Sequence, residues 1–524
     1  MKLKRNEIIN RVIIMLTSVI TLSIIILYVS KLFSSIAYPY PGEIRGAANI
    51  LWADAISKGI NPYDLSNPPE SFSRYATVYS GLSLLISGKI AGLFGLDVIK
   101  TVYVFNVIAL LMTALINALA ACRDRMNESF SAVPFIVFAE GLSVFMYVSG
   151  KPGQLAVLLV SVAYYLCDRN KYPAVQAILM VAAFWDKQYF VICALPVFIK
   201  HVIDKNWKST AKYSITGVVT GLSSLIFVLY RYPVFFIETF MSRSVDEGYY
   251  AITVQECLHN TLSQMYIVLK NYWQFAIPAI AGVCLCIVIK KIDIYQIVLI
   301  CMTIFLLYFG ISNGNFMVYH YELLVPPLLA GGARALIDIV NRYKDSPKIK
   351  WIIVAVCVCF TVAGPIHSYN SMASTRVLSD EEAGEYENLY SYIDSNSGKI
   401  FLGAAAAQYA VNHEGDYVIS NGLSGYFTGM RMGGVNRGIK EENKLSHLLV
   451  PDADAIIEKS VLFEEERRSM IKNKEFSVLV FCDDVDGGII DPDGELENYY
   501  HIVDSFELAN TAGQKCVVNC WEAN

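Results

Sequence analysis

Charged residues are scarce in this chain of 524 residues, at 17%, where a soluble protein of this size carries roughly 25%. The chain also lacks a Walker loop, a GxGxxG turn after a strand and an HExxH zinc motif. The sequence shows no stripe of basic residues on a soluble surface that could bind nucleic acid. Hydrophobic residues instead make up 55% of the chain. These features exclude a soluble enzyme, a disordered scaffold and a nucleic-acid-binding protein.

The few charges are divided unevenly along the chain. Residues 1–367 contain 30 Lys and Arg against 20 Asp and Glu, whereas residues 368–524 contain 12 against 27. We therefore predict two parts, a transmembrane domain over residues 1–367 and an acidic domain over residues 368–524.

Long apolar runs suited to crossing a bilayer define the first part. The candidates are 11–33, 76–94, 99–121, 131–149, 154–167, 172–185, 188–200, 213–231, 273–290, 293–311, 321–340 and 351–367. Short basic clusters between them mark the cytoplasmic side. From Arg125 onward, each pair of successive basic clusters is separated by two apolar runs, which places these clusters on one side of the membrane. Three runs precede Arg125, so the N-terminal cluster lies on the same side only if one of those three does not cross.

The run 76–94 is the weakest of the early candidates, because it contains glycines, serines and an internal Lys89. We interpret it as a juxtamembrane or re-entrant helix on the outer side. The prediction is a polytopic α-helical membrane protein of about 11 spans, with a cytoplasmic N-terminus, in the plasma membrane. Its large outer loops are 34–98 and 232–272, and the acidic domain is extracytoplasmic.

The first outer loop combines a carboxylate and a guanidinium at the mouth of the first span. After Pro39, Pro41 and Gly42, an amphipathic helical pattern runs from Glu43 to Lys58. Glu43 suits a general base acting on an acceptor hydroxyl, and Arg45 suits a phosphate. Alternatively, Glu43 offsets a helix dipole and Arg45 reaches lipid phosphates. Spacing alone leaves both interpretations open.

The order of motifs in this loop resembles the GT-C membrane glycosyltransferases. It reads PGE-x-R, then an amphipathic helix ending in KG, then NPYD, then Y-x-x-x-Y before a segment closing in LFG. It is most similar to the branch of protein mannosyltransferases and lipid A aminoarabinose transferases. The resemblance covers roughly residues 1–340 and implies an inverting transfer from a polyprenyl-phosphate-linked sugar on the outer face.

The resemblance also implies roles for individual residues. Related first loops often read Asp-Glu-x-Arg, whereas here Gly42 replaces the first acid, so Glu43 inherits the role of catalytic base. Related enzymes have a lysine at the break where Lys187 stands, and there it contacts donor phosphate; pairing with Asp186 is the alternative. Lys151, in a similar break, is a weaker candidate for substrate binding.

Two further polar groups are candidates for the substrate site. His320, Tyr321 and Glu322 precede a proline-bearing run, where related enzymes often line the donor pocket. We assign His320 to donor phosphate and the other two to substrate, with an interfacial belt as the alternative. Arg74 and Tyr75 precede the run 76–94, close to where a substrate enters.

The acidic domain shows the mixed pattern of a small α/β domain. A helix is predicted over 378–395, with further helical stretches at 455–462 and 467–474. Strands are predicted over 399–402, 417–420, 476–481, 501–508 and 515–521. Of its three cysteines, Cys516 and Cys520 are too far apart on one strand to bond each other, and Cys482 is a candidate partner for either.

We predict an inverting glycosyltransferase of cell-envelope or surface-polysaccharide biosynthesis. It moves a sugar from a polyprenyl-phosphate donor to an extracytoplasmic glycan, lipid or protein. Its partners are that donor, the acceptor and membrane lipids, and not nucleic acid. No cofactor or metal ligand cluster is required by the sequence, although the superfamily allows a divalent metal. The alternatives are a lipid-linked oligosaccharide transporter and a polysaccharide polymerase or ligase with a lipid-diphosphate donor.

Overall fold

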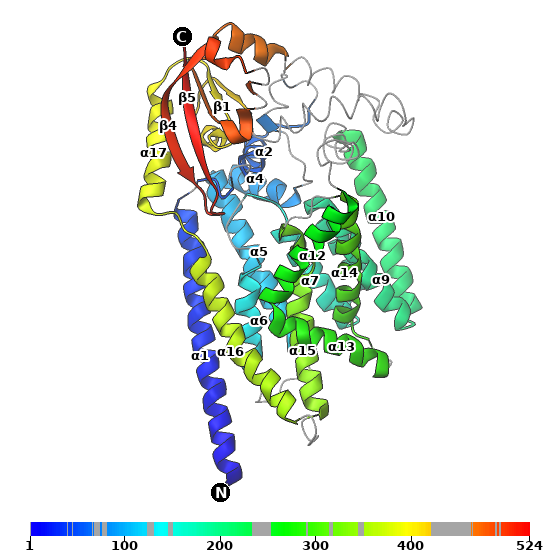
Figure 1. The fold of residues 1–524 in the computed structure, drawn as a ribbon. Coiled ribbons are helices and arrows are strands. Elements are labelled where there is room, and N and C mark those ends of the chain that lie inside the picture. Colours follow the sequence, from blue (N-terminus) through cyan, green and yellow to red (C-terminus); the bar gives the residue numbers. More distant parts are fainter. Residues whose placement is uncertain are drawn as a thin grey trace.

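The protein is a helical bundle with a small sheet domain at one end, as seen in its computed structural model (Figure 1). The structure describes residues 2–38, 40–43, 46–64, 67, 74–75, 81–122, 130–144, 150–232, 253–289, 292–313, 318–343, 350–420, 463, 465–487, 490–491 and 494–524. The N-terminus lies at the end of the bundle farthest from the sheet. The predicted combination of a helical part and a small C-terminal domain with a sheet is therefore confirmed.

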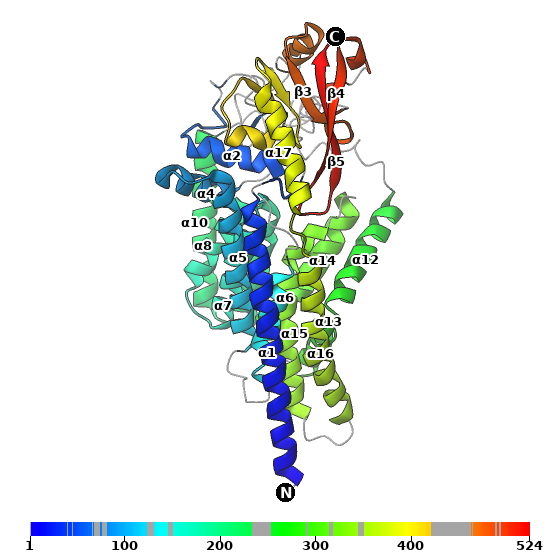
Figure 2. The same cartoon turned by 90° about the vertical axis from the view of Figure 1, so that its left-hand side faces the viewer.

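The bundle consists of helices that run roughly along one direction (Figures 1 and 2). Their bounds are α1 (Lys2–Ala37), α5 (Val98–Ala121), α6 (Val133–Leu142), α7 (Gln154–Asp168), α8 (Pro173–Asp186), α9 (Ala194–Ile203), α10 (Trp207–Arg231), α12 (Val254–Asn271), α13 (Trp273–Ile289), α14 (Ile294–Asn313), α15 (Val325–Tyr343) and α16 (Lys350–Ser374). The 3₁₀ turns η3 (Gln188–Cys193) and η5 (Val318–Leu323) interrupt them.

Three of the described helices are long and apolar enough to cross a membrane. They are Arg11–Ala37, Val98–Ala121 and Trp207–Arg231, and several shorter apolar helices accompany them. Many of the shorter ones lie where the sequence predicts spans. The total of about 11 crossings stays a prediction.

Two short helices lie across the end of the bundle beneath the sheet domain. They are α2 (Ala47–Ser57) and α4 (Leu82–Phe94), which pack against each other (Figure 2). Gly88 and Gly92 of α4 permit this contact, because a Cβ on either would lie 2.5 Å or less from a backbone oxygen of α2. The run 76–94, interpreted as a helix that does not cross, thus contributes a crosswise helix.

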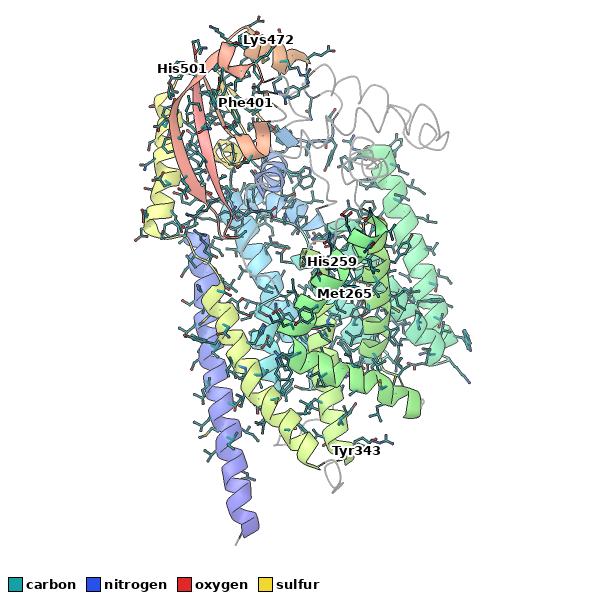
Figure 3. The ribbon with its side chains drawn as sticks, in the orientation of Figure 1. His259, Met265, Tyr343, Phe401, Lys472 and His501 are labelled. Carbon is teal, nitrogen blue, oxygen red and sulfur yellow. The ribbon has the colours of Figure 1, made fainter. Side chains whose placement is uncertain are left out.

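Residues 254–271, within the segment 232–272 that the sequence predicts as an outer loop, form helix α12 alongside α14. The position of this segment relative to a membrane stays a prediction. A capping box between Thr253 and Glu256 starts the helix. Cys257, Thr261 and Val268 recur on one buried face, which explains why the segment packs as a helix. Figure 3 shows His259 and Met265 along it.

The small domain contains α17 (Asp380–Ser395) and a five-stranded sheet of order β2-β1-β3-β5-β4. The strands are β1 (Ile400–Leu402), β2 (Tyr417–Ile419), β3 (Val478–Cys482), β4 (Tyr500–Ala509) and β5 (Lys515–Ala523). β1 pairs in parallel with β2 and β3, and β5 pairs antiparallel with β3 and β4. Short turns complete it: η6 (Ala407–Val411), the π-helical η8 (Asp483–Gly487) and η9 (Leu496–Asn498). All five predicted strands are confirmed.

Of the three helices predicted in this domain, two are present and one lies outside the described residues. Residues 380–395 form α17, whose buried Tyr386, Leu389 and Ile393 stand on the predicted face. Residues 465–472 are also helical, whereas 455–462 lies outside the described residues. Cys482, Cys516 and Cys520 are all buried, and the side chains of Cys482 and Cys516 interact with each other.

One buried apolar cluster joins the bundle to the small domain. It runs from Tyr28 of α1 and Ile50 of α2 through Val102 of α5 to Leu389 of α17 and Val480 of β3. A separate cluster around Phe401 fills the other side of the sheet (Figure 3). Burial of this kind is the main force that holds elements together. The small domain is therefore packed onto the end of the bundle that bears α2 and α4.

Candidate functional site

Glu43 lies between the end of α1 and the start of α2. Its carbonyl accepts a hydrogen bond of 2.8 Å from the N–H of Gly46, which turns the chain into the helix. Its carboxylate forms an ion pair with Lys151, and the two side chains are 12% and 19% exposed. The sequence placed these residues in separate loops, and the structure brings them together.

The approach of Lys151 to Glu43 depends on close packing by its neighbour. Gly150 lies against α2, where a Cβ would come within 2.7 Å of the Ile50 side chain. A larger residue there would require the Ile50 side chain to shift. The glycine before Lys151 therefore allows its segment to lie close to α2.

Lys187 and Glu322 form a second ion pair, in which both side chains are only 3% exposed. The ammonium nitrogen lies 2.6 Å from Glu322 Oε1. The hydroxyl of Tyr189 also donates to that oxygen. Gly153 has a φ of +140°, and a Cβ there would lie 2.9 Å from Glu322 Oε2 and 3.2 Å from Lys187 Nζ. Only glycine adopts this backbone conformation readily and leaves room for the pair.

The two ion pairs belong to one charged cluster. Lys151 acts electrostatically on Glu322 as well as on Glu43. The order is Glu43, Lys151, Glu322 and Lys187, so acids and bases alternate. These residues come from four segments that are far apart in the sequence. We call these four residues the charged row.

Asp186, next to Lys187, holds the backbone around the charged row. Its carboxylate accepts N–H bonds from Ser83 at 2.7 Å and from Gly153 and Ala156 at 3.0 Å each. It is fully buried, which is tolerable because these donors replace water. The sequence interpretation had offered Asp186 as the partner of Lys187; the ion-pair partner in the structure is Glu322.

His320 and Tyr321 stand beside the charged row. The His320 ring lies 5.4 Å from the ring of Tyr189 and 5.0 Å from that of Phe309. His320 and Tyr321 are 5% and 3% exposed. An interfacial belt needs exposed rings, so the buried triplet 320–322 is instead part of the packed wall next to Lys187.

Arg74 and Tyr75 are found near the opposite end of α2 from Glu43. The Arg74 guanidinium lies 5.6 Å from the centre of the Tyr75 ring. Arg74 acts electrostatically on Asp54, which is 2% exposed and pairs with Lys58 at 2.8 Å. Burial raises the pKa of Asp54 above its usual range, although Lys58 and Arg74 oppose the shift.

A cavity of about 390 Å³ lies between α2, α4 and α10. Its lining is mainly aromatic and aliphatic and includes Trp52, Trp185 and Phe227. Lys89 and Arg231 are the cationic residues in that lining. An apolar cavity with a few charges is the usual form of a site for an amphiphilic ligand.

The remaining predicted residue, Arg45, lies outside the described residues. Within the described part of the chain, no group of three or more His, Cys, Asp or Glu is placed to hold a metal ion. Sequence reasoning missed the roles of Asp186 and Gly153. The available signals were the Asp-Lys pair at the end of an apolar run and the glycine before Gln154.

No protein-family model matches the chain, and no curated protein matches it. Among solved structures, ArnT from Cupriavidus metallidurans bound to undecaprenyl phosphate is 10% identical, with a TM-score of 0.46 over 96% of this chain and 97% of that one. The archaeal oligosaccharyltransferase AglB from Archaeoglobus fulgidus, in complex with an inhibitory peptide and a dolichol-phosphate, is 11% identical, with a TM-score of 0.44 over 99% of this chain and 74% of that one.

The arabinofuranosyltransferase AftD from Mycobacteria is 10% identical, with a TM-score of 0.40 over 95% of this chain and 41% of that one. Because these similarities are low, the proposal below rests on the charged row.

Proposed function

We propose that the protein is a membrane glycosyltransferase that moves a sugar from a polyprenyl-phosphate carrier to an extracytoplasmic acceptor. The observation that supports this most is the convergence of Glu43, Lys151, Glu322 and Lys187 in one charged row. The row supplies a carboxylate for proton transfer and cations for a phosphate, and these are the two requirements of the reaction.

In the proposed mechanism, the acceptor hydroxyl attacks the anomeric carbon from the face opposite the phosphate. Its proton passes to the Glu43 carboxylate as the new C–O bond forms. The bond from the anomeric carbon to the phosphate oxygen breaks, and the electron pair stays on that oxygen. Lys151 and Lys187 stabilise the negative charge that develops there. One displacement inverts the anomeric configuration.

The apolar cavity between α2, α4 and α10 supports a lipid-linked substrate. Its aromatic and aliphatic lining suits an isoprenoid chain, and Lys89 and Arg231 suit an anionic group next to that chain. We propose that the cavity holds part of the lipid carrier.

The transporter alternative requires polar groups at the middle of the bundle, and Glu140 is the main example. Its carboxylate pairs with His367 at 2.6 Å and accepts a bond of 3.1 Å from Ser368 and one of 3.4 Å from Gln274. These donors come from α13 and α16, and Glu140 is fully buried. A carboxylate with both oxygens bonded to neighbouring helices in this way is typical of a site that fixes helix packing, so we favour the enzyme.

The proposed topology places the N-terminus in the cytoplasm and the small domain outside the plasma membrane. Its support is the charge pattern of the connections, together with the position of the small domain at the bundle end away from the N-terminus. Labelling of intact cells with a membrane-impermeant reagent at an added cysteine in the small domain tests it. Labelling only after permeabilisation would contradict it.

The test of function is transfer of a labelled sugar from a polyprenyl-phosphate donor by the purified protein in liposomes. We expect Glu43→Gln to lower turnover by about 100-fold or more, which is typical for loss of a general base. Glu466→Gln, at an exposed acid of the small domain, is the matched control. Turnover of Glu43→Gln at the wild-type level would disprove the mechanism. Transfer only from a donor that carries the sugar on a lipid diphosphate, with release of that diphosphate, would favour the polymerase or ligase.

A further inference from the structure

The turn between β4 and β5 is held rigid by its own hydrogen bonds. The Asn510 side-chain amide donates to Gln514 Oε1 at 2.9 Å, and the Gln514 N–H donates to Asn510 Oδ1 at 3.0 Å. The Gly513 N–H closes the turn on the Asn510 carbonyl at 2.9 Å, with a φ of +79° at Gly513. Such a turn presents its remaining donors in fixed directions.

Two of those donors meet a single carbonyl of the first outer loop. The Ala512 N–H lies 3.1 Å from the Gly42 oxygen, and the Thr511 hydroxyl lies 3.3 Å from the same oxygen. Thr511 is 7% exposed, so the contact is shielded from water. The tip of the small domain therefore touches the residue directly before Glu43.

The bundle holds Gly42 from its other side. Its N–H lies 3.3 Å from the hydroxyl of Tyr103 on α5, and that hydroxyl donates to the Tyr40 carbonyl at 2.8 Å. The Tyr40 ring stacks on Tyr386 of α17 at 4.5 Å. The segment 40–42 is thus held between α5 and the small domain.

The contact with the Gly42 carbonyl fixes Glu43 because of peptide planarity. The Gly42 carbonyl and the Glu43 N–H belong to one planar unit, so holding the oxygen also sets the orientation of the Glu43 nitrogen. The following peptide is held by the bond from Gly46 to the Glu43 carbonyl. With both flanking peptides held, the direction of the Cα–Cβ bond of Glu43, from which its carboxylate projects, is set.

We propose that Thr511 and Ala512 are positioning residues for Glu43, so that the small domain completes the catalytic site of the bundle. This inference rests on the proposed function in one respect, the role of Glu43 as base. The contact also gives the small domain a role that its acidic surface does not reveal. A displacement of a catalytic group by about 1 Å lowers turnover by on the order of 100-fold. Loss of the two hydrogen bonds to the Gly42 carbonyl should therefore lower turnover.

The test compares full-chain variants in liposomes. Thr511→Val removes the hydroxyl at constant volume, and Asn510→Ala loosens the turn. Thr511→Ser keeps the hydroxyl, and Lys515→Gln changes an exposed residue of the same hairpin. We expect kcat to fall about 10-fold in the first two, with little change in KM. The acid limb of the pH profile of kcat should shift with them, and both controls should match the wild type.

Hydrogen exchange of residues 38–46 supplies a readout that does not depend on activity. We expect faster exchange there in Thr511→Val and Asn510→Ala, at unchanged thermal stability of the whole protein. Wild-type exchange, kcat and pH profile in both variants would overturn the inference, even if Glu43→Gln is inactive. If Glu43→Gln turns over normally, the proposed function fails, whereas faster exchange would still establish the hold of the turn on Gly42.

Discussion

The ammonium group of Lys187 lies 2.6 Å from the carboxylate of Glu322, and both side chains are almost completely shielded from solvent. The two residues are 135 positions apart in the chain. A close partner of opposite sign makes a buried charge tolerable. This pair is therefore important for the stability of the protein, and it belongs to the proposed catalytic site.

Removing one member of this pair should destabilise the protein strongly. We expect Lys187→Met or Glu322→Leu alone to lower the free energy of unfolding by about 3–5 kcal/mol, because each leaves an uncompensated buried charge. The double variant should recover most of that loss. Thermal unfolding in detergent measures all three. If Lys187 also binds donor phosphate, the double variant should fold and yet transfer no sugar; wild-type transfer would contradict that role.

Asp186→Asn should weaken the attachment of α4 and α7 to the charged row. An amide has one acceptor oxygen in place of two, so one of the N–H groups of Ser83, Gly153 and Ala156 would face an NH₂ group. The expected loss is about 1–3 kcal/mol. Thermal unfolding beside Asp504→Asn, an exposed acid, measures it. An equal effect in the two variants would be inconsistent with this role.

Phe227→Ala should weaken binding of the lipid-linked donor without slowing chemistry. Phe227 lines the apolar cavity, and loss of an aromatic contact of roughly 1.5 kcal/mol raises KM about 10-fold. The effect should shrink with a donor whose isoprenoid chain is shortened. Ile226→Ala, on the neighbouring position of α10 and outside the cavity lining, is the control. A KM equal to that of the control would show that the cavity does not hold the chain.

Asp54→Asn should change how stability depends on pH. Because burial raises the pKa of Asp54 in the folded protein, the folded state favours the protonated form. The stability from this group is full below its ordinary pKa of 3.8 and is lost as pH rises through the higher folded value. The variant cannot ionise, so its Tm should fall less than that of the wild type from about pH 4 to pH 8. Parallel Tm curves would contradict this.

Local patterns in the sequence predicted most of the secondary structure. Tyr386, Leu389 and Ile393 stand at helical spacing and are the buried face of α17, and all five strands follow runs of apolar residues. Helix α12 was missed because most of its residues are polar or exposed, and its short buried face only becomes meaningful beside α14. Hydropathy alone does not report such a packing partner.

The candidate site was predictable residue by residue but not as a set. Chemistry, position in the chain and the resemblance to the GT-C glycosyltransferases selected Glu43, Lys151, Lys187 and Glu322 one at a time. Their pairing depends on long-range packing, including the room that Gly153 leaves, and no local pattern encodes it. Asp186 was undervalued for a related reason, since its partners are backbone N–H groups whose positions only the folded chain defines.

The hydrogen bonds from the β4–β5 turn to Gly42 have a consequence for the order in which the protein is built. Thr511 and Gly42 are 469 positions apart, and synthesis proceeds from the N-terminus. The donors to the Gly42 carbonyl are therefore synthesised only after the whole bundle. In the proposed topology, the small domain must also be translocated and folded first. A nascent chain held in the membrane before that moment lacks the hold of the β4–β5 turn on Gly42, so biogenesis itself delays the assembly of the site.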